Sequence, residues 1–498
     1  MPKHAWNAIE AHELQDLSSL FEKEPDRLSA LCHEVAGLTF DWSKTHLDRE
    51  LLELSTSLAE ESGFAAARDA LFAGEVVNIT EGRAAEHLAE RGSGKPDAVE
   101  LAAARRTRMR ALVDAIEAGA FGDVSAVVHI GIGGSVLGPE LLVDALGRTG
   151  ARLDVRFLSN IDPQAFREAV EGLEPRSTLI VAASKTFTTS ETMANLSAAL
   201  DWLKQGDVVD AYGRVIAVTA DPEAAIEAGI DESRILQFSE GVGGRYSLWS
   251  AVGISAALSL GWDAFEELLE GAAEMDRHFR YSEPTANLPL LAAFADQLYT
   301  HRLKCQTRGV FPYEERLRLL VSFLQQLEME SNGKSVRSDG KPVDGPTSPV
   351  VWGGVGTDAQ HAVFQLLHQG TLVIPVEFLA VAEDETELPD HHRQLLLNAF
   401  AQAAALMRGK TSDDPHRSYA GNRPSSTILI DRLDARSLGA LLAFYEHRTF
   451  ANAVLLGINP FDQFGVELGK AIARELAEGE GEGDLDASTR SLMERANI

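Results

Sequence analysis

Cysteine is scarce in this sequence. The 498 residues contain only 2 cysteines, Cys32 and Cys305, which is too few to cross-link a chain of this length through disulfides. Both lie in segments with a helical pattern, and we expect buried, unreactive thiols at both positions. This cysteine usage predicts a chain that works in the reducing cytoplasm.

Long apolar runs and basic residues are lacking as well. No stretch of 18 apolar residues occurs, so we predict no transmembrane helix and no membrane partner, and the first 17 residues lack the apolar core of a secretory signal. The 45 Lys and Arg residues stand against 75 Asp and Glu, which gives a net charge of −30. A surface this acidic repels phosphate backbones, so nucleic-acid binding is not expected, and any anionic substrate needs a local cluster of donors.

Strand-like and helix-like segments alternate over most of the chain. Short β-branched runs at 124–130, 177–183 and 214–220 are separated by Ala-rich helical segments. The alternation resumes with strands at 371–381 and 425–433 and a helix at 438–456 whose end could be a strand. This order predicts an α/β fold with parallel sheets that are covered by helices on both faces.

The chain is long enough for more than one domain. We expect an N-terminal helical segment at 1–100 that packs on the larger domain, a first α/β domain at 101–260 and a second at 261–475. An acidic tail follows at 476–498, and the Glu- and Gly-rich stretch from 475 to 488 is typical of a mobile, solvated end.

Two glycine-rich or hydroxyl-rich turns follow predicted strands, where ligands bind in open parallel sheets. The first, "HIGIGGSVLGPELL", frees the backbone at Gly134 and offers the Ser135 hydroxyl, but Val136 breaks the spacing of a dinucleotide site. By itself such a turn is as readily structural as functional. The second, "SKTFTTSET" at 184–192, places five hydroxyls around Lys185 before a helix. A helix cap needs one hydroxyl, so this density favours a site for a phosphate monoester.

Two charged residues lie in equally short motifs. Arg245 follows the glycines of "GVGGRYSLWSAVG", where it could be a fixed cation for a ligand or an arginine in a tight turn. Glu330, in "MESNGKS", lies between an apolar helical stripe and a turn, as a surface charge or as a catalytic base.

These motifs together resemble the phosphoglucose isomerase family. Seven segments match that family in its order: "NITEGRAAEH", "GIGGSVLGP", "SKTFTTSET", "GGRYSLWSAVG", "MESNGKS", "GTDAQHAVFQLLHQGT" and "DQFGVELGK", between residues 78 and 470. The resemblance implies two sugar-isomerase (SIS) α-β-α sandwich domains with flanking helices, a homodimer, no metal or organic cofactor, and interconversion of glucose 6-phosphate with fructose 6-phosphate. Val136 replaces a usually acidic residue, which leaves tolerance of mannose 6-phosphate open.

The resemblance also assigns roles. Glu330 matches the glutamate that carries a proton between C2 and C1, and Arg245 matches the cation beside the enediolate. His361 and Lys470 match the ring-opening pair, with the histidine supplied by the neighbouring subunit; His368 is a candidate by chemistry alone. The expected phosphate and sugar contacts are Gly134, Ser135, Ser184, Lys185, Thr186, Thr189 and Gln463.

Three other functions compete with this interpretation. An isomerase of another phosphosugar would keep "SKTFTT" without needing Glu330, His361 and Lys470 together. A non-catalytic sugar-phosphate sensor would need no base, and a nicotinamide dehydrogenase fails on its glycine spacing. The pair His391 and His392 follows a predicted helix start, so we expect a solvated helix end there. No histidine or cysteine spacing predicts a metal site.

Overall fold

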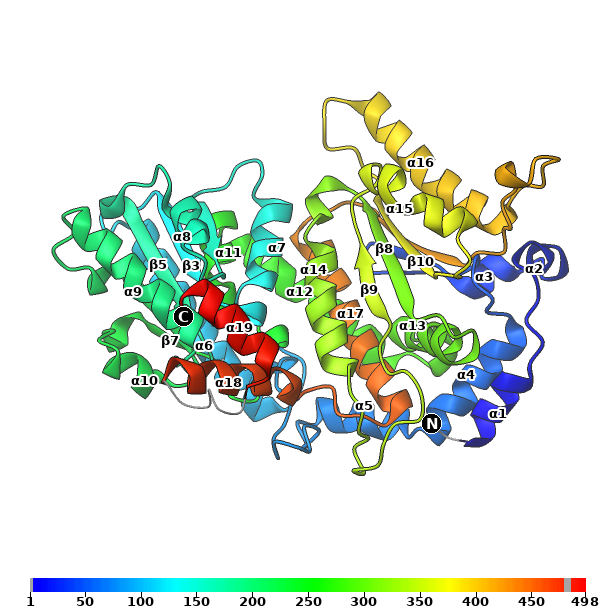
Figure 1. Cartoon of the computed structure of the whole chain (residues 1–498), viewed down its shortest axis with the longest axis horizontal. Helices are drawn as coiled ribbons and strands as arrows, with labels where there is room; N and C mark the ends of the chain where they lie inside the picture. The colour runs from blue at the N-terminus through cyan, green and yellow to red at the C-terminus, as the bar shows by residue number, and fades with distance from the viewer. Residues whose placement is uncertain (1–2, 479–484) are drawn as a thin grey trace. The chain divides into compact units, whose positions relative to one another are not determined.

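A computed structural model describes residues 3–478 and 485–498, and its strands form two sheets (Figure 1). Residues 1–460 make one compact unit that contains both sheets, and residues 461–498 make a second. The second unit contains α18 (Glu467–Ala477) and α19 (Ala487–Ala496). Six of the fourteen residues of the predicted mobile stretch 475–488, namely 479–484, lie outside the described residues, while Glu475 and Ser488 belong to these two helices.

The first sheet has five parallel strands in the order β4-β3-β5-β6-β7. The strands are β3 (Ala126–Ile130), β4 (Asp154–Leu158), β5 (Thr178–Ala183), β6 (Val215–Thr219) and β7 (Ile235–Gln237). The predicted strands at 124–130, 177–183 and 214–220 are confirmed as β3, β5 and β6. These three strands are buried along their whole length, which explains their nearly continuous apolar sequence.

Helices cover both faces of this sheet. On one face α8 (Pro163–Val170), α9 (Ser190–Gln205) and α10 (Pro222–Glu227) pack on alternate strand residues such as Val128 and Ile180. On the other face lies α11 (Ile254–Leu260), whose Ser255 bonds to His129 of β3. Nearby are α6 (Pro96–Glu117) and α7 (Leu137–Leu146), both in contact with α11 (Figure 1). The predicted α-β-α layering is confirmed for this half of the unit.

The second sheet has six strands in the order β1-β2-β11-β10-β8-β9. Its parallel strands are β8 (Thr307–Tyr313), β9 (Val350–Gly353), β10 (Val376–Val381) and β11 (Ser425–Ile430). A hairpin from the N-terminal region, β1 (Cys32–Val35) and β2 (Leu38–Asp41), adds to the sheet by antiparallel pairing of β2 with β11. The N-terminal hundred residues therefore contribute strands as well as helices.

The cysteines lie in surroundings other than the expected helices. Cys32 is the first residue of β1 and is half-buried, while Cys305 is buried just before β8. Neither forms a disulfide, and burial raises the pKa of the Cys305 thiol to about 11. The expected inertness of Cys305 therefore has a physical cause, because its thiolate is disfavoured at neutral pH.

The helices around the second sheet also form two layers (Figure 1). On one face α15 (Asp358–Gln369) and α16 (Pro389–Arg408) pack on aromatic residues of β8 and β10. Helix α17 (Ala435–Leu456) is buried along nearly all of its length and packs against α12 (Trp262–Tyr281) and α13 (Leu288–Gln297). The predicted strand at the end of 438–456 was wrong, because the helix continues to Leu456 and ends at Gly457 with φ 68°.

The remaining helices complete the first unit. The N-terminal ones are α1 (Lys3–Ala11), α2 (Leu17–Lys23), α3 (Arg27–Leu31), α4 (Arg49–Glu61) and α5 (Phe64–Phe72). Between β8 and β9, α14 (Leu320–Leu324) continues into a π-helical turn at Gln325–Glu330. Within the described ranges, no helix is long and apolar enough to span a membrane.

Candidate functional site

Three loops leave strands of the first sheet at its carboxyl edge. The first loop follows β3 and contains the 3-10 turn Gly133–Ser135, the second is 184–189 after β5, and the third runs from 238 to Arg245 after β7. Because these strands are parallel, their carboxyl ends meet at one edge, where open α/β sheets bind ligands. The three motifs singled out in the sequence therefore lie at one place in the fold.

Loop 184–189 carries the predicted phosphate donors. The Ser184 and Thr189 hydroxyls lie 3.0 Å apart, and the Thr186 hydroxyl lies 2.7 Å from that of Thr188. The backbone turns sharply at Phe187, which has φ 52° in the left-handed region. Thr189 is the N-cap residue of α9, but its side chain makes no capping bond. The first N–H groups of the 16-residue helix α9 and its positive dipole end are thus suited to an anion.

Lys185 joins two of the loops. Its ammonium donates to the carbonyl of Glu240 at 2.7 Å and to that of Val242 at 3.2 Å, in the loop that leads to Arg245. Burial, followed by the nearby positive charge of Arg83, lowers the pKa of Lys185. In this arrangement the Lys185 side chain links loop 184–189 to the loop that leads to Arg245.

The glycine loop after β3 approaches the Arg245 loop very closely. A Cβ added at Gly134 would lie 2.2 Å from the carbonyl carbon of Gly244 and 2.5 Å from the nitrogen of Arg245. Ser135 is held from below by His129, whose Nε2 donates to the Ser135 carbonyl at 2.8 Å. Burial lowers the pKa of His129 to about 4, so its Nδ1 accepts the Ser255 hydroxyl at 2.7 Å in the neutral tautomer.

Arg245 is buried, with 3% of its surface exposed, and its guanidinium is held on three sides. Its Nε donates to the Ser331 hydroxyl at 2.6 Å, and another nitrogen donates to the carbonyl of Pro460. The remaining terminal nitrogen lies 3.7 Å from Oε2 of Glu330. The structure therefore brings together the arginine and the glutamate that were predicted from motifs 85 residues apart.

Glu330 lies at the end of the π-helical turn that continues α14. Its side chain is 19% exposed, and its Oε2 is buried and has no hydrogen-bond partner among the residues that the structure describes. A buried carboxylate oxygen that has a cation nearby but receives no hydrogen bond can accept a proton from a ligand. A solvated carboxylate on the surface would be a less effective base. Gln326, four residues earlier, reaches the glycine loop, because its Nε2 lies 2.8 Å from the Cβ position of Gly133.

The two candidate histidines differ in their surroundings. His361 lies on α15 with its side chain exposed, and among the described residues it forms no hydrogen bond or ion pair. His368, two turns further along the helix, bonds through Nε2 to Gln402 of α16 at 2.8 Å, which is a structural contact between helices. The expected helix start before His391 and His392 is confirmed as the first turn of α16.

Gln463 and Lys470 belong to the second unit. Lys470 lies on α18 with its side chain exposed within that unit, and Gln463 precedes a 3-10 turn at Phe464–Val466. The geometry of the first unit thus joins Glu330, Arg245 and the loop residues without reference to these two side chains.

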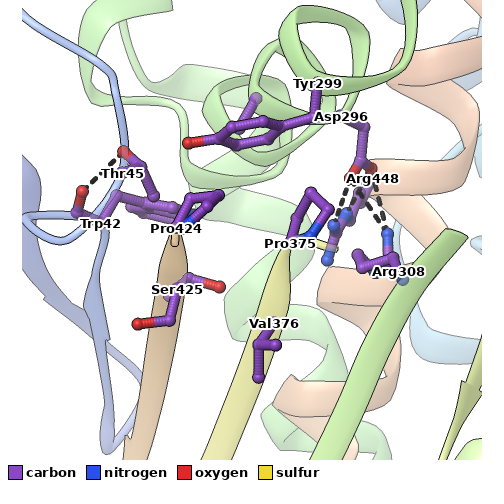
Figure 2. A pocket seen from close by; sticks show the side chains of 12 residues that line it. Trp42, Thr45, Asp296, Tyr299, Arg308, Pro375, Val376, Pro424, Ser425 and Arg448 are labelled. Carbon is purple, nitrogen blue, oxygen red and sulfur yellow. Dashed lines mark hydrogen bonds and ion pairs between the residues drawn. The ribbon is translucent and has the colours of Figure 1, made fainter. Parts of the chain in front are cut away.

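A cavity of about 20 Å³ lies in the second sheet, at the amino ends of β8, β10 and β11 (Figure 2). It borders a buried ion cluster in which Asp296 accepts from Arg308 at 3.1 Å and from Arg448 at 2.6 Å. Arg308 also bonds Glu328 at 2.6 Å. The space fits about one water molecule, and the cluster ties the turn that carries Glu330 to β8, so this edge supports the site structurally.

Sequence reasoning missed several residues that shape the site. The Ser331 hydroxyl lies between the Arg245 guanidinium and the Tyr246 hydroxyl, 3.0 Å from the latter. Its position beside Glu330 in "MESNGKS" is the only signal that the sequence offers. Among residues 3–478 and 485–498, no group of three His, Cys, Asp or Glu side chains is arranged to hold a metal ion.

Known proteins resemble this chain over nearly all of its length. The phosphoglucose isomerase family matches residues 41–493. The glucose-6-phosphate isomerase of Rhizorhabdus wittichii is 63% identical over 495 residues, 99% of each chain, and that of Zymomonas mobilis is 56% identical over 99% of this chain and 97% of its own. A crystal structure of glucose-6-phosphate isomerase from Chlamydia trachomatis covers 99% of this chain and 98% of its own, with 31% identity and a TM-score of 0.90.

Proposed function

Because the chain belongs to the phosphoglucose isomerase family and interconverts glucose 6-phosphate and fructose 6-phosphate, we propose that Glu330 carries the proton in this reaction. The two sheets are accordingly those of two sugar-isomerase domains. The observation that carries the proposal is the buried Oε2 of Glu330, which has no hydrogen-bond partner in the described part of the chain and lies beside Arg245. In the open-chain sugar, this carboxylate takes the proton from C2 and returns it to C1, while the hydroxyl proton moves from O2 to O1.

Arg245 acts on the charge that develops between these two transfers. Removing the C2 proton gives an enediolate, and a fixed guanidinium near its oxygens lowers the energy of that anion. Ser331 and the Pro460 carbonyl fix Arg245 before substrate arrives, so no reorganisation is needed at the moment of reaction. The ion pair distance of 3.7 Å to Glu330 is long enough for a substrate oxygen to compete for the same nitrogen.

The phosphate end of the substrate binds at loop 184–189. The donors are the hydroxyls of Ser184, Thr186 and Thr189, the backbone N–H of Lys185, and Ser135 with the N–H of Gly134. Two observations support this assignment. The Ser184 and Thr189 hydroxyl oxygens lie only 3.0 Å apart, and the positive dipole end of α9 lies at this loop. These local donors hold a dianion against the net charge of −30.

His361 and Lys470 open the sugar ring, and Gln463 contacts a sugar hydroxyl. The family resemblance supports these roles, and the exposure of His361 on α15 fits a histidine that serves another subunit. We therefore propose a cytoplasmic homodimer with shared active sites. Exposed apolar side chains on α15, on α16 and between α15 and β10 support an interface there: Leu366, Leu372, Val373, Leu397 and Phe400.

We also propose the domain limits 101–260 and 261–475, with 1–100 packed on the larger domain and 476–498 as an acidic tail. The separation of strands supports the division, because β3 to β7 form one sheet and β8 to β11 belong to the other. The hairpin β1–β2 supports an attachment of the N-terminal segment to the second domain.

Two assays test the function. The first follows glucose 6-phosphate formation from purified chain and fructose 6-phosphate by a coupled reaction, with and without chelator; mannose 6-phosphate is the alternative substrate. We expect activity that chelator does not change, because the proposed steps use only side chains. Absence of glucose 6-phosphate would reject the function, and loss of activity with chelator would reject a metal-free mechanism.

The second assay tests the shared sites by mixing two inactive variants, Glu330→Gln and His361→Ala. Random exchange makes half of the dimers mixed, and each mixed dimer has one intact site, so activity returns to about a quarter of the parent value. Activity that stays at the level of the separate variants would contradict a histidine supplied by the partner. The mixture of Glu330→Gln with Arg245→Met serves as the control, because both residues of a site come from the same subunit, so no mixed dimer has an intact site and activity should not return.

A further inference from the structure

The segment 78–87, "NITEGRAAEH", has no role in the proposed reaction, although it contacts several of the residues that surround Arg245. It forms a short hairpin in which Asn78 and Arg83 pair in an antiparallel bridge. No residue of this segment is among the proposed catalytic or phosphate-binding residues. Its polar groups are nevertheless engaged by the two stretches of chain that hold Arg245 in place.

The first of these stretches is the loop that precedes Arg245. The backbone N–H of Glu86 donates to the carbonyl of Gly241 at 2.9 Å, and the Glu86 carboxylate accepts a short hydrogen bond from the Ser239 hydroxyl. Arg83 donates to the carbonyl of Glu240 at 3.2 Å. Three consecutive residues of the loop are therefore fixed by the hairpin, from a direction other than that of Lys185.

The second stretch is the end of the first unit. The Asn459 amide donates to Oδ1 of Asn78 at 2.9 Å and to the Thr80 hydroxyl at 2.8 Å. Asn459 is buried and directly precedes Pro460, whose carbonyl accepts from the guanidinium of Arg245. The same hairpin thus fixes the backbone that carries one of the acceptors of Arg245.

A third contact reaches the residue after Arg245. The ring of His87 packs on that of Tyr246, with 4.8 Å between centroids, and the Tyr246 hydroxyl lies 3.0 Å from that of Ser331. Complete burial holds the pKa of His87 well below its usual range, and the positive charge of Arg91 lowers it further. His87 is therefore uncharged at neutral pH and adds no repulsion near Arg245.

We propose that residues 78–87 are a positioning element for Arg245, which they hold through the loop 239–241, through Asn459 and through Tyr246. The inference rests on the proposed role of Arg245 in stabilising the enediolate. A guanidinium that is displaced by even 1 Å stabilises the transition state much less, whereas the phosphate loop meets loop 239–241 through the long Lys185 side chain and has its Lys185 backbone held by Thr219 and Ala220. The element therefore acts on the chemical step more than on substrate binding.

The test replaces Glu86, which is half-buried, in two variants and adds one control substitution elsewhere. We expect Glu86→Ala to lower kcat about tenfold while KM for fructose 6-phosphate and inhibition by inorganic phosphate change less than about twofold. Glu86→Gln retains an acceptor for Ser239 and restores most of kcat. Asp384→Ala is the matched control, because it removes another carboxylate that accepts from a hydroxyl, that of Thr386 at 2.7 Å, on a surface loop. An unchanged kcat in Glu86→Ala, or a rise in KM alone, would overturn the proposal.

The same substitution in an Arg245→Met background separates positioning from general damage. If residues 78–87 act through Arg245, then Glu86→Ala lowers kcat no further once the guanidinium is gone. A further tenfold loss in the double variant would refute the inference. If Arg245→Met alone leaves kcat intact, the proposed role of Arg245 fails; if it lowers kcat and Glu86→Ala does not, only the positioning element fails.

Thr80→Val provides a second variant in case Glu86→Ala does not fold. Thr80 is exposed, and valine keeps its shape while removing an acceptor for the Asn459 amide. We expect a fall in kcat of about threefold with unchanged KM and Tm, since one of the two Asn459 bonds remains. A kcat equal to that of the parent chain would contradict the positioning of Arg245 through Asn459.

Discussion

The close approach of two loops at Gly134 gives a quantitative prediction for Gly134→Ala. An alanine Cβ would lie 2.2 Å from the carbonyl carbon and oxygen of Gly244. Carbon atoms in van der Waals contact are about 3.5 Å apart, so the glycine loop and the Arg245 loop must separate by roughly 1 Å. Both neighbours are backbone atoms, which cannot rotate away as a side chain would.

A separation of about 1 Å displaces the Gly134 and Ser135 donors from Arg245, and misplacement on this scale costs about 100-fold in rate. We therefore expect kcat/KM to fall about 100-fold, which corresponds to about 2.7 kcal/mol of transition-state stabilisation. Overpacking also lowers the free energy of unfolding by about 1–3 kcal/mol. The assay is steady-state turnover of fructose 6-phosphate, together with thermal unfolding of the same preparation.

The neighbouring glycine supplies the control for stability. A Cβ added at Gly244 meets no heavy atom within 4 Å, and Gly244 does not have a positive φ. Gly244→Ala is therefore expected to keep its Tm within about 1 °C of the parent value. A Gly134→Ala variant with kcat/KM within threefold of the parent would refute the claim that the two loops are held at contact distance.

Three further predictions concern single residues. Thr189→Ala removes one donor to a charged group and should raise KM about tenfold with kcat within twofold, whereas an unchanged KM would contradict its place in the phosphate site. Ser331→Ala releases Nε of Arg245 and should lower kcat about tenfold, with KM nearly constant; a normal kcat would show that Arg245 needs no such anchor. His129 has a pKa of about 4 against an ordinary value of 6.5, so its contribution to stability is complete above pH 6.5 and is lost as the pH falls toward 4. Between pH 7 and 4, the free energy of unfolding measured in urea should therefore fall by up to about 3 kcal/mol more in the parent than in His129→Gln. Equal decreases in the two proteins would contradict this.

The strands that are buried on both faces were the easiest part of the fold to predict. β3, β5 and β6 are fully buried and β10 is as well, so their sequences are apolar and β-branched with clear ends. The hairpin β1–β2 lacks this pattern, because it lies at the edge of its sheet and several of its side chains are only half-buried. Its place depends on pairing of Asp41 with Thr427, a contact that no local pattern contains.

The end of α17 shows how burial hides helical periodicity. Residues 435–456 are buried nearly all around, including charged side chains such as Glu446 and Arg448, so the sequence shows no amphipathic stripe and its last residues resemble a strand. Packing against α12 and α13 determines the helix instead.

The candidate site could be predicted in its parts but not in its connections. Motif resemblance identified Glu330 and Arg245, and the strand ends indicated where loop 184–189 would lie. The bonds that fix Arg245 come from Ser331 and Pro460, which are 86 and 215 residues away in the sequence. Such contacts depend on how the two sheets are joined, which spacing along the chain does not encode.

The engagement of Lys185 is a further detail that depends on the fold. The sequence indicates a cation in a hydroxyl-rich loop, which suits a direct phosphate contact. In the fold its ammonium instead donates to the carbonyls of Glu240 and Val242, because the loops after β5 and β7 leave the same edge of the sheet, with only β6 between the two strands.

The central claim is that Glu330 moves the proton between C2 and C1. The most direct measurement uses glucose 6-phosphate labelled with deuterium at C2 and follows loss of the label to water by NMR, in the parent chain and in Glu330→Gln. Glutamine keeps the shape of the side chain but cannot act as the base, so we predict a label-exchange rate that falls roughly 1000-fold while the Kd of inorganic phosphate stays within about threefold. Exchange in Glu330→Gln at a rate close to that of the parent would contradict the claim.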